Sequence, residues 1–168
     1  HHSDDDDEEV CEEVFLAAAS KDGQLRSWAM SLTRSRYELL YEPRHSHSVL
    51  EEDEAERGGG GGSDFITCLT QDPRTSFSAP HSATSSLLLG YGTKRGRVAV
   101  WDMRRHCLLL SWQAHSADVS GIEWFLPTTS SDNPLLLTAS HDGSVKCWEA
   151  LTSRHITTVA QHSSSVVS

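Results

Sequence analysis

The 168-residue sequence lacks the features that mark membrane proteins and disulfide-rich secreted proteins. No apolar run approaches the roughly 18 residues that a membrane-spanning helix requires, and no signal peptide is recognisable. Its four cysteines, Cys11, Cys68, Cys107 and Cys147, form no CxxC pair, which argues against a zinc ribbon. Together these absences predict a protein of a reducing compartment, the cytoplasm or the nucleus, without a membrane partner.

The sequence also lacks the short motifs that identify common enzyme classes. The glycine run at residues 58–62 is not followed by the Lys-Ser/Thr of a phosphate-binding loop. Neither a GxSxG nucleophile elbow nor an HExxH zinc motif occurs, and the ten histidines show no metal-ligand spacing. We therefore predict no catalytic residues, no metal site, no cofactor and no enzymatic activity.

The formal net charge of −10 is concentrated in two short runs. Thirteen of the 24 acidic residues lie within residues 4–13 and 51–56, which leaves 11 acids against 14 lysines and arginines elsewhere. Runs of like charge are usually solvated and disordered, although such a run can also dock a basic partner. We predict an acidic disordered run at residues 1–13 and a flexible acidic and glycine-rich insertion at residues 45–63.

A glycine followed five positions later by a tryptophan recurs three times in the chain. The three segments read KDGQLRSW, TKRGRVAVW and SHDGSVKCW, and they end at Trp28, Trp101 and Trp148. Each follows a short apolar run, which reads VFLAAAS, LLLGYG or LLLTAS. Because accidental matches do not keep register, the chain repeats a unit of apolar strand, tight turn and second strand.

Turn residues and alternating side chains predict the strands of each unit. The Asp-Gly pairs at 22–23 and 142–143 predict two-residue turns of the primed type, which need positive φ angles. The first unit lacks a convincing inner strand. From inner to outer strand, we predict 65–70, 87–91, 97–103 and 107–113 for the middle unit, and 119–125, 135–140, 144–149 and 155–160 for the last.

These residues resemble WD repeats, the units of β-propeller blades. Trp101-Asp102 matches the family's Trp-Asp pair in full, Trp148-Glu149 keeps the acid, and Trp28 keeps only the ring. An upstream histidine also recurs, because His115 and His162 each lie 14 residues after a tryptophan. The resemblance implies an all-β fold, a partial β-propeller of four-stranded antiparallel blades. Its repeats are predicted at residues 14–44 (incomplete), 64–114 and 115–162, with the start of a further repeat at 163–168.

The resemblance also implies a buried hydrogen-bonded set in each repeat, made of a His, a Ser or Thr, an Asp and the Trp. The last repeat supplies His115, Ser140, Asp142 and Trp148. A buried indole N–H and a buried imidazole need such partners. We interpret this set as structural, although a His-Ser-Asp trio invites the alternative of a catalytic triad.

The middle repeat departs from that pattern. It offers His45 or His47, Thr93 and Trp101, but Arg95 stands where the aspartate belongs. We therefore expect its hydrogen-bonded set to be incomplete.

Three repeats leave strand edges and apolar sheet faces exposed, because a closed propeller typically has about four to eight blades. We expect the chain to be part of a longer protein that is completed by further WD repeats. The resemblance implies a non-catalytic scaffold or adaptor whose partners are other proteins. The loop residues Ser116 and Asp118, beside an inner strand, are expected to face a partner.

A sharper alternative starts from the run Trp101-Asp102-Met103-Arg104. It is similar to a motif of WD-repeat substrate receptors of cullin-RING ubiquitin ligases, in which the arginine contacts the ligase's adaptor protein. The resemblance implies that Arg104 makes this contact and that Asp102 braces the turn. The plainer alternative is an exposed arginine after a strand.

A second alternative is an RNA- or phosphate-binding subunit of an RNA-processing complex. Lys94, Arg95, Arg97, Arg104 and Arg105 cluster around one predicted hairpin, and basic patches bind phosphates. No aromatic stacking platform accompanies them and the acidic runs oppose this binding, so nucleic acid is the less favoured partner.

Overall fold

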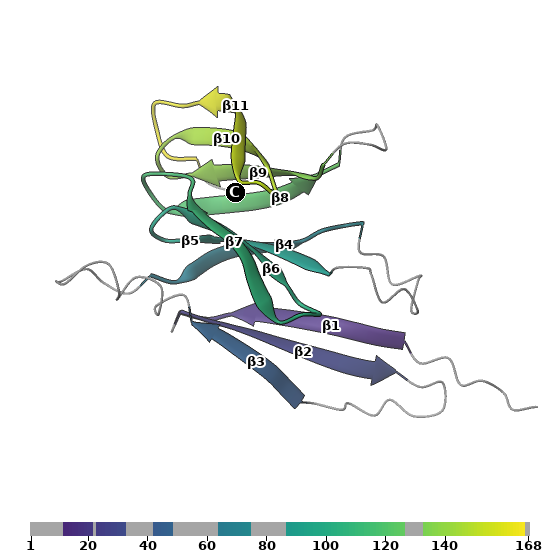
Figure 1. The fold of residues 1–168 in the computed structure, drawn as a ribbon. Coiled ribbons are helices and arrows are strands. Elements are labelled where there is room, and N and C mark those ends of the chain that lie inside the picture. Colours follow the sequence, from purple (N-terminus) through teal and green to yellow (C-terminus); the bar gives the residue numbers. More distant parts are fainter. Residues whose placement is uncertain are drawn as a thin grey trace, which may run out of the picture.

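The chain folds into three antiparallel β-sheets, which the computed structural model describes for residues 12–21, 23–32, 42–48, 64–74, 87–126 and 133–166. The first sheet contains β1 (Glu12–Ala19), β2 (Gln24–Leu32) and β3 (Glu42–Ser48). The second contains β4 (Ile66–Gln71), β5 (Leu88–Thr93), β6 (Arg97–Asp102) and β7 (Cys107–Gln113). The third contains β8 (Val119–Phe125), β9 (Leu135–Ser140), β10 (Ser144–Glu149) and β11 (Arg154–Gln161). The sheets follow one another in space in chain order (Figure 1).

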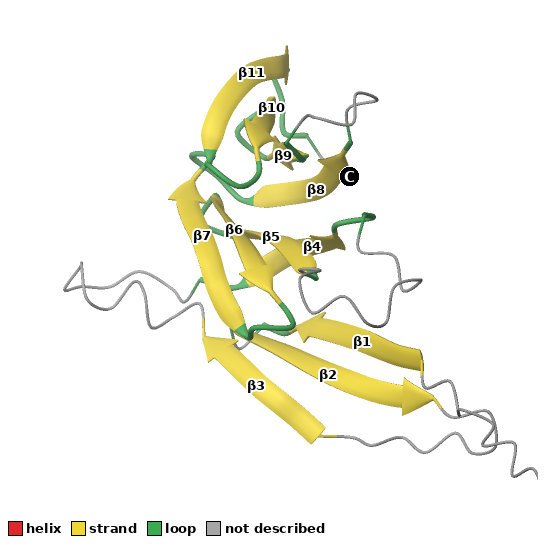
Figure 2. Ribbon diagram, turned by 45° about the vertical axis from the view of Figure 1, so that its right-hand side comes forward, coloured by secondary structure: helices red, strands yellow, loops and turns green. Residues whose placement is uncertain are grey.

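Regular structure in the described residues is all strand, without any helix (Figure 2). In that part of the chain, no helix offers the length and apolar character that crossing a membrane requires. Neighbouring strands in each sheet are also neighbours in sequence, so every sheet is an antiparallel meander. The predicted all-β fold with four-stranded antiparallel sheets is confirmed by the second and third sheets.

The second sheet is buried on both faces because it lies between the other two (Figure 1). All six residues of β5 and five of the six in β6 are buried, as expected for strands covered on both sides. In β9, buried and half-buried positions alternate, which is the pattern of a strand packed on one face. The outer strand β11 is exposed over its first six residues.

Two clusters of buried apolar side chains join the sheets. Trp101 of β6 lies in the cluster that includes Leu25 of β2, between the first and second sheets. Trp148 of β10 lies in the cluster that includes Val98 of β6, between the second and third sheets. Each of these tryptophans thus packs its own sheet against the preceding one. Full burial of one large apolar side chain stabilises the fold by roughly 1.5–3 kcal/mol, so these contacts are major contributors.

The turns that lead into the tryptophan strands each contain one left-handed glycine. The positive φ angles belong to Gly23 (78°), Gly96 (82°) and Gly143 (85°). Our prediction of a two-residue primed turn at 142–143 is wrong, because three residues separate β9 from β10 and only the last of them is left-handed. A side chain at position 96 would also collide with the backbone carbonyl of His115, so glycine is required there on steric grounds.

Two predicted boundaries shift at the first sheet. β1 begins at Glu12, so residues 12 and 13 belong to a strand and not to the acidic run. β3 extends to Ser48, so the predicted insertion at 45–63 starts too early. The reason is pairing, because all of β3 lies along residues 24–29 of β2 and covers that part of its hydrogen-bonding edge. Residues 1–11 and 49–63, the remainder of the predicted run and insertion, lie outside the described residues.

The C-terminal segment repeats the course of the segment that leads into β8. The Thr67 hydroxyl donates a hydrogen bond of 2.5 Å to the carbonyl of Val119, the first residue of β8. One repeat later, the Ser120 hydroxyl donates a hydrogen bond of 2.6 Å to the carbonyl of Val166. Val166 therefore takes the place that starts an inner strand, and the further repeat that we expect at 163–168 stays a prediction.

Candidate protein-interaction face

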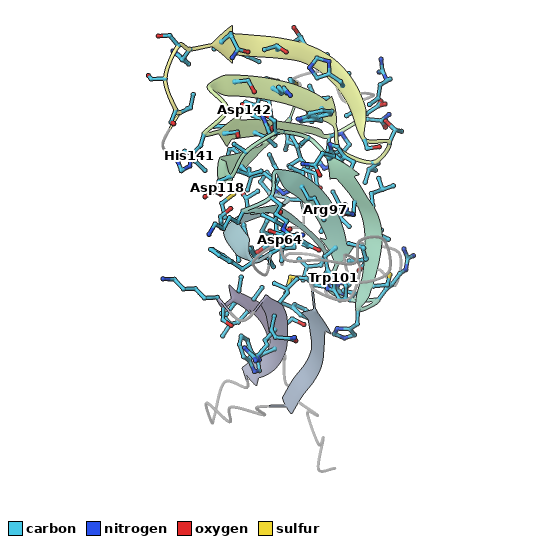
Figure 3. All side chains as sticks on the ribbon, turned by 90° about the vertical axis from the view of Figure 1, so that its left-hand side faces the viewer. Asp64, Arg97, Trp101, Asp118, His141 and Asp142 are labelled. Atoms are coloured by element: carbon cyan, nitrogen blue, oxygen red, sulfur yellow. The ribbon has the colours of Figure 1, made fainter. Side chains whose placement is uncertain are left out.

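One end of the second and third sheets carries the tight turns together with the segments that lead into the inner strands. We call this end the turn face; it consists of residues 64–65, 94–96, 115–118 and 141–143, and Figure 3 views the molecule from this side. Equivalent hydrogen bonds of 2.9 Å form in both sheets. The N–H of Lys94 donates to the carbonyl of Phe65, and the N–H of His141 donates to the carbonyl of Asp118. Lys94 and His141 thus occupy equivalent positions, as do Phe65 and Asp118.

A continuous chain of hydrogen bonds crosses the third sheet below the turn face. The indole N–H of Trp148 donates to Oγ1 of Thr138 at 2.9 Å, and this hydroxyl lies 2.7 Å from Nε2 of His115. On the other side of the ring, Nδ1 of His115 lies 3.0 Å from Oδ2 of Asp142. The network assigns a neutral imidazole with its proton on Nδ1, because each group then donates one bond towards the carboxylate.

The charge states agree with this arrangement. Burial lowers the pKa of His115 and outweighs the raising effect of the Asp142 carboxylate. Burial also acts to raise the pKa of Asp142, but hydrogen bonds from the hydroxyl and N–H of Ser144 and from the N–H of Ser116 hold it below its usual range. His115 is 2% exposed, so a substrate has no access to the imidazole. The geometry therefore suits a structural role and not a catalytic one.

Thr138 takes the place that we predicted for Ser140. The Ser140 hydroxyl instead accepts the N–H of Asp142 at 3.1 Å, within the turn. The strand register explains the difference, because Trp148 pairs with Leu136 and Thr138 lies two residues further along the same face. Ser140 lies four residues from Leu136, and a rise of about 3.3 Å per residue puts it beyond the reach of the indole.

The second sheet uses a carboxylate from a different segment. Our choice of His45 or His47 for its hydrogen-bonded set is wrong, because both lie within β3 and pair with β2 of the first sheet. Asp64, just before β4, is 1% exposed. Its Oδ1 accepts hydrogen bonds from the N–H groups of Phe65 and Arg95, both at 3.0 Å.

In both sheets a hydrogen bond joins the tight turn to the segment that leads into the inner strand, but donor and acceptor change places. In the third sheet the turn supplies the carboxylate, and Oδ2 of Asp142 accepts the N–H of Ser116 at 3.1 Å. In the second sheet the inner-strand segment supplies the carboxylate of Asp64, and the turn supplies the N–H of Arg95. The sequence signal for this arrangement is an acid directly before a predicted inner strand, and we did not predict a role for Asp64 from it.

Ser116 and Asp118 lie on the turn face, where we expected partner contacts. Ser116 is exposed, and the side chain of Asp118 is 28% exposed. Oδ2 of Asp118 lies 3.7 Å from Nδ1 of His141, whose side chain is 40% exposed. Figure 3 shows His141, Asp118 and Asp142 together at this end of the third sheet. We did not predict a role for His141 from the sequence, although its position before an Asp-Gly pair places it in a turn.

The motif predicted to bind a ligase adaptor lies at the opposite end of β6 from the turn face. Asp102 is fully buried, and its Oδ1 accepts the N–H groups of Arg104 at 2.9 Å and Arg105 at 3.0 Å. This carboxylate therefore braces the turn after β6. The Arg104 guanidinium lies 5.5 Å from the ring centroid of Phe15 in the first sheet. Such an exposed cation–π contact contributes about 0.5–1 kcal/mol.

The five basic residues that we expected around one hairpin are divided between the two ends of β6. Lys94, Arg95 and Arg97 lie at its start, and Arg104 and Arg105 follow its end. Six strand residues at about 3.3 Å each separate the two groups by roughly 20 Å. The prediction of a single basic cluster is therefore wrong, because a β-strand holds its two ends far apart. Within the described ranges, no group of three His, Cys, Asp or Glu side chains could hold a metal ion.

Comparison with known families gives a match between residues 106–149 and the model described as "WD domain, G-beta repeat". The matched segment contains β7, the outer strand of the second sheet, and β8, β9 and β10 of the third. One sequence repeat therefore spans two sheets, and it starts earlier than the repeat predicted at 115–162. The chain of this repeat therefore runs directly from the second sheet into the third.

Several known proteins are similar to this chain in sequence or in structure. Periodic tryptophan protein 2 of Arabidopsis thaliana is 33% identical over 73 residues, which are 44% of this chain and 8% of that protein. The solved structures of U3-55K and of the RRP9 WD40 repeats each match 95% of this chain and 42% and 41% of their own, with a TM-score of 0.59 and 19% identity. The computationally designed Ika4 protein matches 91% of this chain and 71% of its own, with a TM-score of 0.55 and 20% identity.

The chain spans less than half the length of U3-55K and of the RRP9 repeats. At these identities the solved structures establish the fold and nothing more. The match to a WD domain covers the segment in which the turn glycine, the tryptophan and the buried histidine come together. Residues 106–149 thus match a WD repeat, and the described residues have the fold of part of a β-propeller.

Proposed function

We propose that this protein is a non-catalytic scaffold that binds other proteins through the turn face. One observation carries the proposal: below that face, the polar groups of His115, Thr138 and Asp142 bond to one another, whereas the side chains of Lys94 and Ser116 are exposed on the face itself. A rigid frame that presents varied loop side chains suits binding, and its buried polar groups have no reactive surface.

The match of residues 106–149 to a WD domain supports this proposal, because WD repeats mediate protein–protein interactions. The chain covers only part of its relatives, so the partners of the whole protein are part of the proposal, as are the further WD repeats that would complete the propeller. A cytoplasmic or nuclear location is likewise proposed.

A position-specific photocrosslinker tests the proposal. We would place it at His141 on the turn face and, as the matched control, at Thr152, an exposed turn residue between β10 and β11 at the other end of the third sheet. A scaffold that uses the turn face should give discrete protein adducts from position 141 and few from position 152. Equal adducts from both positions, or none from position 141, would reject it.

A second candidate is a substrate receptor of a cullin-RING ubiquitin ligase that acts through Trp101-Asp102-Met103-Arg104. Arg104 is exposed after a turn that Asp102 holds, which favours this candidate. Its contact with Phe15 would first have to break. Pull-down with the ligase's adaptor protein should lose binding on Arg104→Ala and keep it on Arg105→Ala. Equal or absent binding would remove the candidate.

A further inference from the structure

We propose that the segment bound at the turn face is acidic, and that Lys94 and Arg95 bind its carboxylates. This inference rests on the proposed role of the turn face as an interaction surface. Both residues are exposed in the turn between β5 and β6. The equivalent turn of the third sheet carries His141 and Asp142, so adjacent cations distinguish the second sheet.

Asp64 makes a cation at position 95 compatible with the fold. In the third sheet the equivalent side chain, Asp142, is 12% exposed and is occupied by hydrogen bonds from Ser144 and Ser116. In the second sheet, the buried carboxylate of Asp64 fixes the turn through the main-chain N–H of Arg95. The turn is therefore held without a carboxylate at position 95, and an exposed guanidinium occupies that position.

Lys94 is positioned for contact with an anion. Its Nζ lies 5.2 Å from the ring centroid of Phe65, while the residue itself is exposed. An ammonium group above an aromatic face keeps N–H donors available for a carboxylate. A side chain that already rests on a ring also loses less conformational entropy on binding.

Asp118 limits which part of the turn face an acidic ligand can contact. It occupies the position of Phe65 in the third sheet, and its carboxylate lies beside His141. A ligand carboxylate placed there would be repelled by the Asp118 carboxylate, which disfavours binding in that position. The ligand's acidic residues are therefore directed to the second sheet, over Lys94 and Arg95.

A short acidic peptide fits this surface better than a nucleic acid does. A nucleic-acid backbone binds through a series of cations that follow its phosphates. Here Arg104 and Arg105 lie at the opposite end of β6, and Asp118 lies on the neighbouring sheet of the same face. Two adjacent cations instead match one or two carboxylates.

Fluorescence anisotropy with the full chain tests the inference. The probes are a labelled glutamate-rich peptide, a glutamine-rich peptide of the same length and a single-stranded RNA. We expect only the glutamate-rich peptide to bind, and its affinity to fall about tenfold or more in the double variant Lys94→Gln/Arg95→Gln. The double variant Arg104→Gln/Arg105→Gln should keep the parent affinity, which controls for net charge. The thermal unfolding of both variants shows whether the fold is retained.

Three results would overturn the inference: peptide binding that both double variants reduce equally, no binding of the glutamate-rich peptide, or RNA binding that depends on Lys94 and Arg95. The last of these would replace the acidic peptide with a nucleic acid. The scaffold proposal fails separately, when the crosslinker at His141 captures no protein. Should it capture a partner whose binding ignores Lys94 and Arg95, the scaffold stands and the acidic-segment inference falls.

Discussion

The hydroxyl of Thr138 joins His115 to Trp148, because it lies 2.7 Å from the imidazole Nε2 and 2.9 Å from the indole Nε1. The three residues come from β9, from the segment before β8 and from β10. A single hydroxyl therefore links three segments of the third sheet. All three side chains are buried, so without this oxygen the imidazole Nε2 and the indole N–H would have neither a protein partner nor water.

Replacing Thr138 with valine, which has nearly the same shape, should leave both nitrogen atoms without a partner. Each buried unsatisfied group costs roughly 1–3 kcal/mol, so the loss of both partners should lower the free energy of unfolding by about 2–6 kcal/mol. Thr157→Val, at an exposed position of β11, is the matched control and should change it by less than about 0.5 kcal/mol. Urea unfolding measures both values. Similar losses in the two variants would contradict the hydrogen-bond chain.

Stability should decrease as the pH falls below about 6.5, the ordinary pKa of histidine. Burial lowers the pKa of His115 in the fold, so between its unfolded and folded values the unfolded chain binds the extra proton. The pKa of Asp142 is also lowered, and its contribution is lost at lower pH, as the pH falls from the unfolded value towards the folded one. In His115→Gln the decrease near pH 6 should flatten, whereas His162→Gln, at an exposed residue, should keep it. Unfolding curves across this pH range decide the matter.

Gly92→Ala should destabilise the contact between the second and third sheets. A Cβ at position 92 would lie 2.5 Å from Cγ1 and 2.7 Å from Cβ of Val119, and 2.9 Å from Sγ of Cys68. Overpacking of this kind costs about 1–3 kcal/mol. Gly90→Ala is the control, because a Cβ there meets terminal methyl groups of Leu136 and Ile122 at 3.3 and 3.4 Å. Thermal unfolding should rank Gly92→Ala well below Gly90→Ala, and the reverse order would exclude tight packing at Gly92.

Arg95→Asp should destabilise the second sheet, although it restores the residue type of the third. The new carboxylate would lie near Asp64, which already accepts the N–H of residue 95. Two neighbouring carboxylates repel each other, so we expect a loss of about 1–3 kcal/mol. In a double-mutant cycle, Asp64→Asn should recover part of this loss, with a coupling of roughly 0.5–3 kcal/mol. Strict additivity would show that positions 64 and 95 act independently.

Much of the strand pattern could be predicted because the unit repeats. The strands predicted at 119–125, 135–140 and 144–149 coincide with β8, β9 and β10. Alternating side chains and turn glycines are local signals, and three copies in register reduce the chance of error. At the first sheet the pattern failed, because β3 owes its length to pairing with β2 and carries little apolar alternation of its own.

Some partners in the buried hydrogen bonds could not be predicted from local sequence patterns. Residue types and spacing already placed His115, Asp142 and Trp148 in one repeat. They could not choose between Thr138 and Ser140, because both lie on one face of β9 and only the register against Trp148 separates them. Nor could they pair Asp64 with the N–H of Arg95, 31 positions away in sequence, because that contact forms only after the turn and the inner-strand segment have packed together.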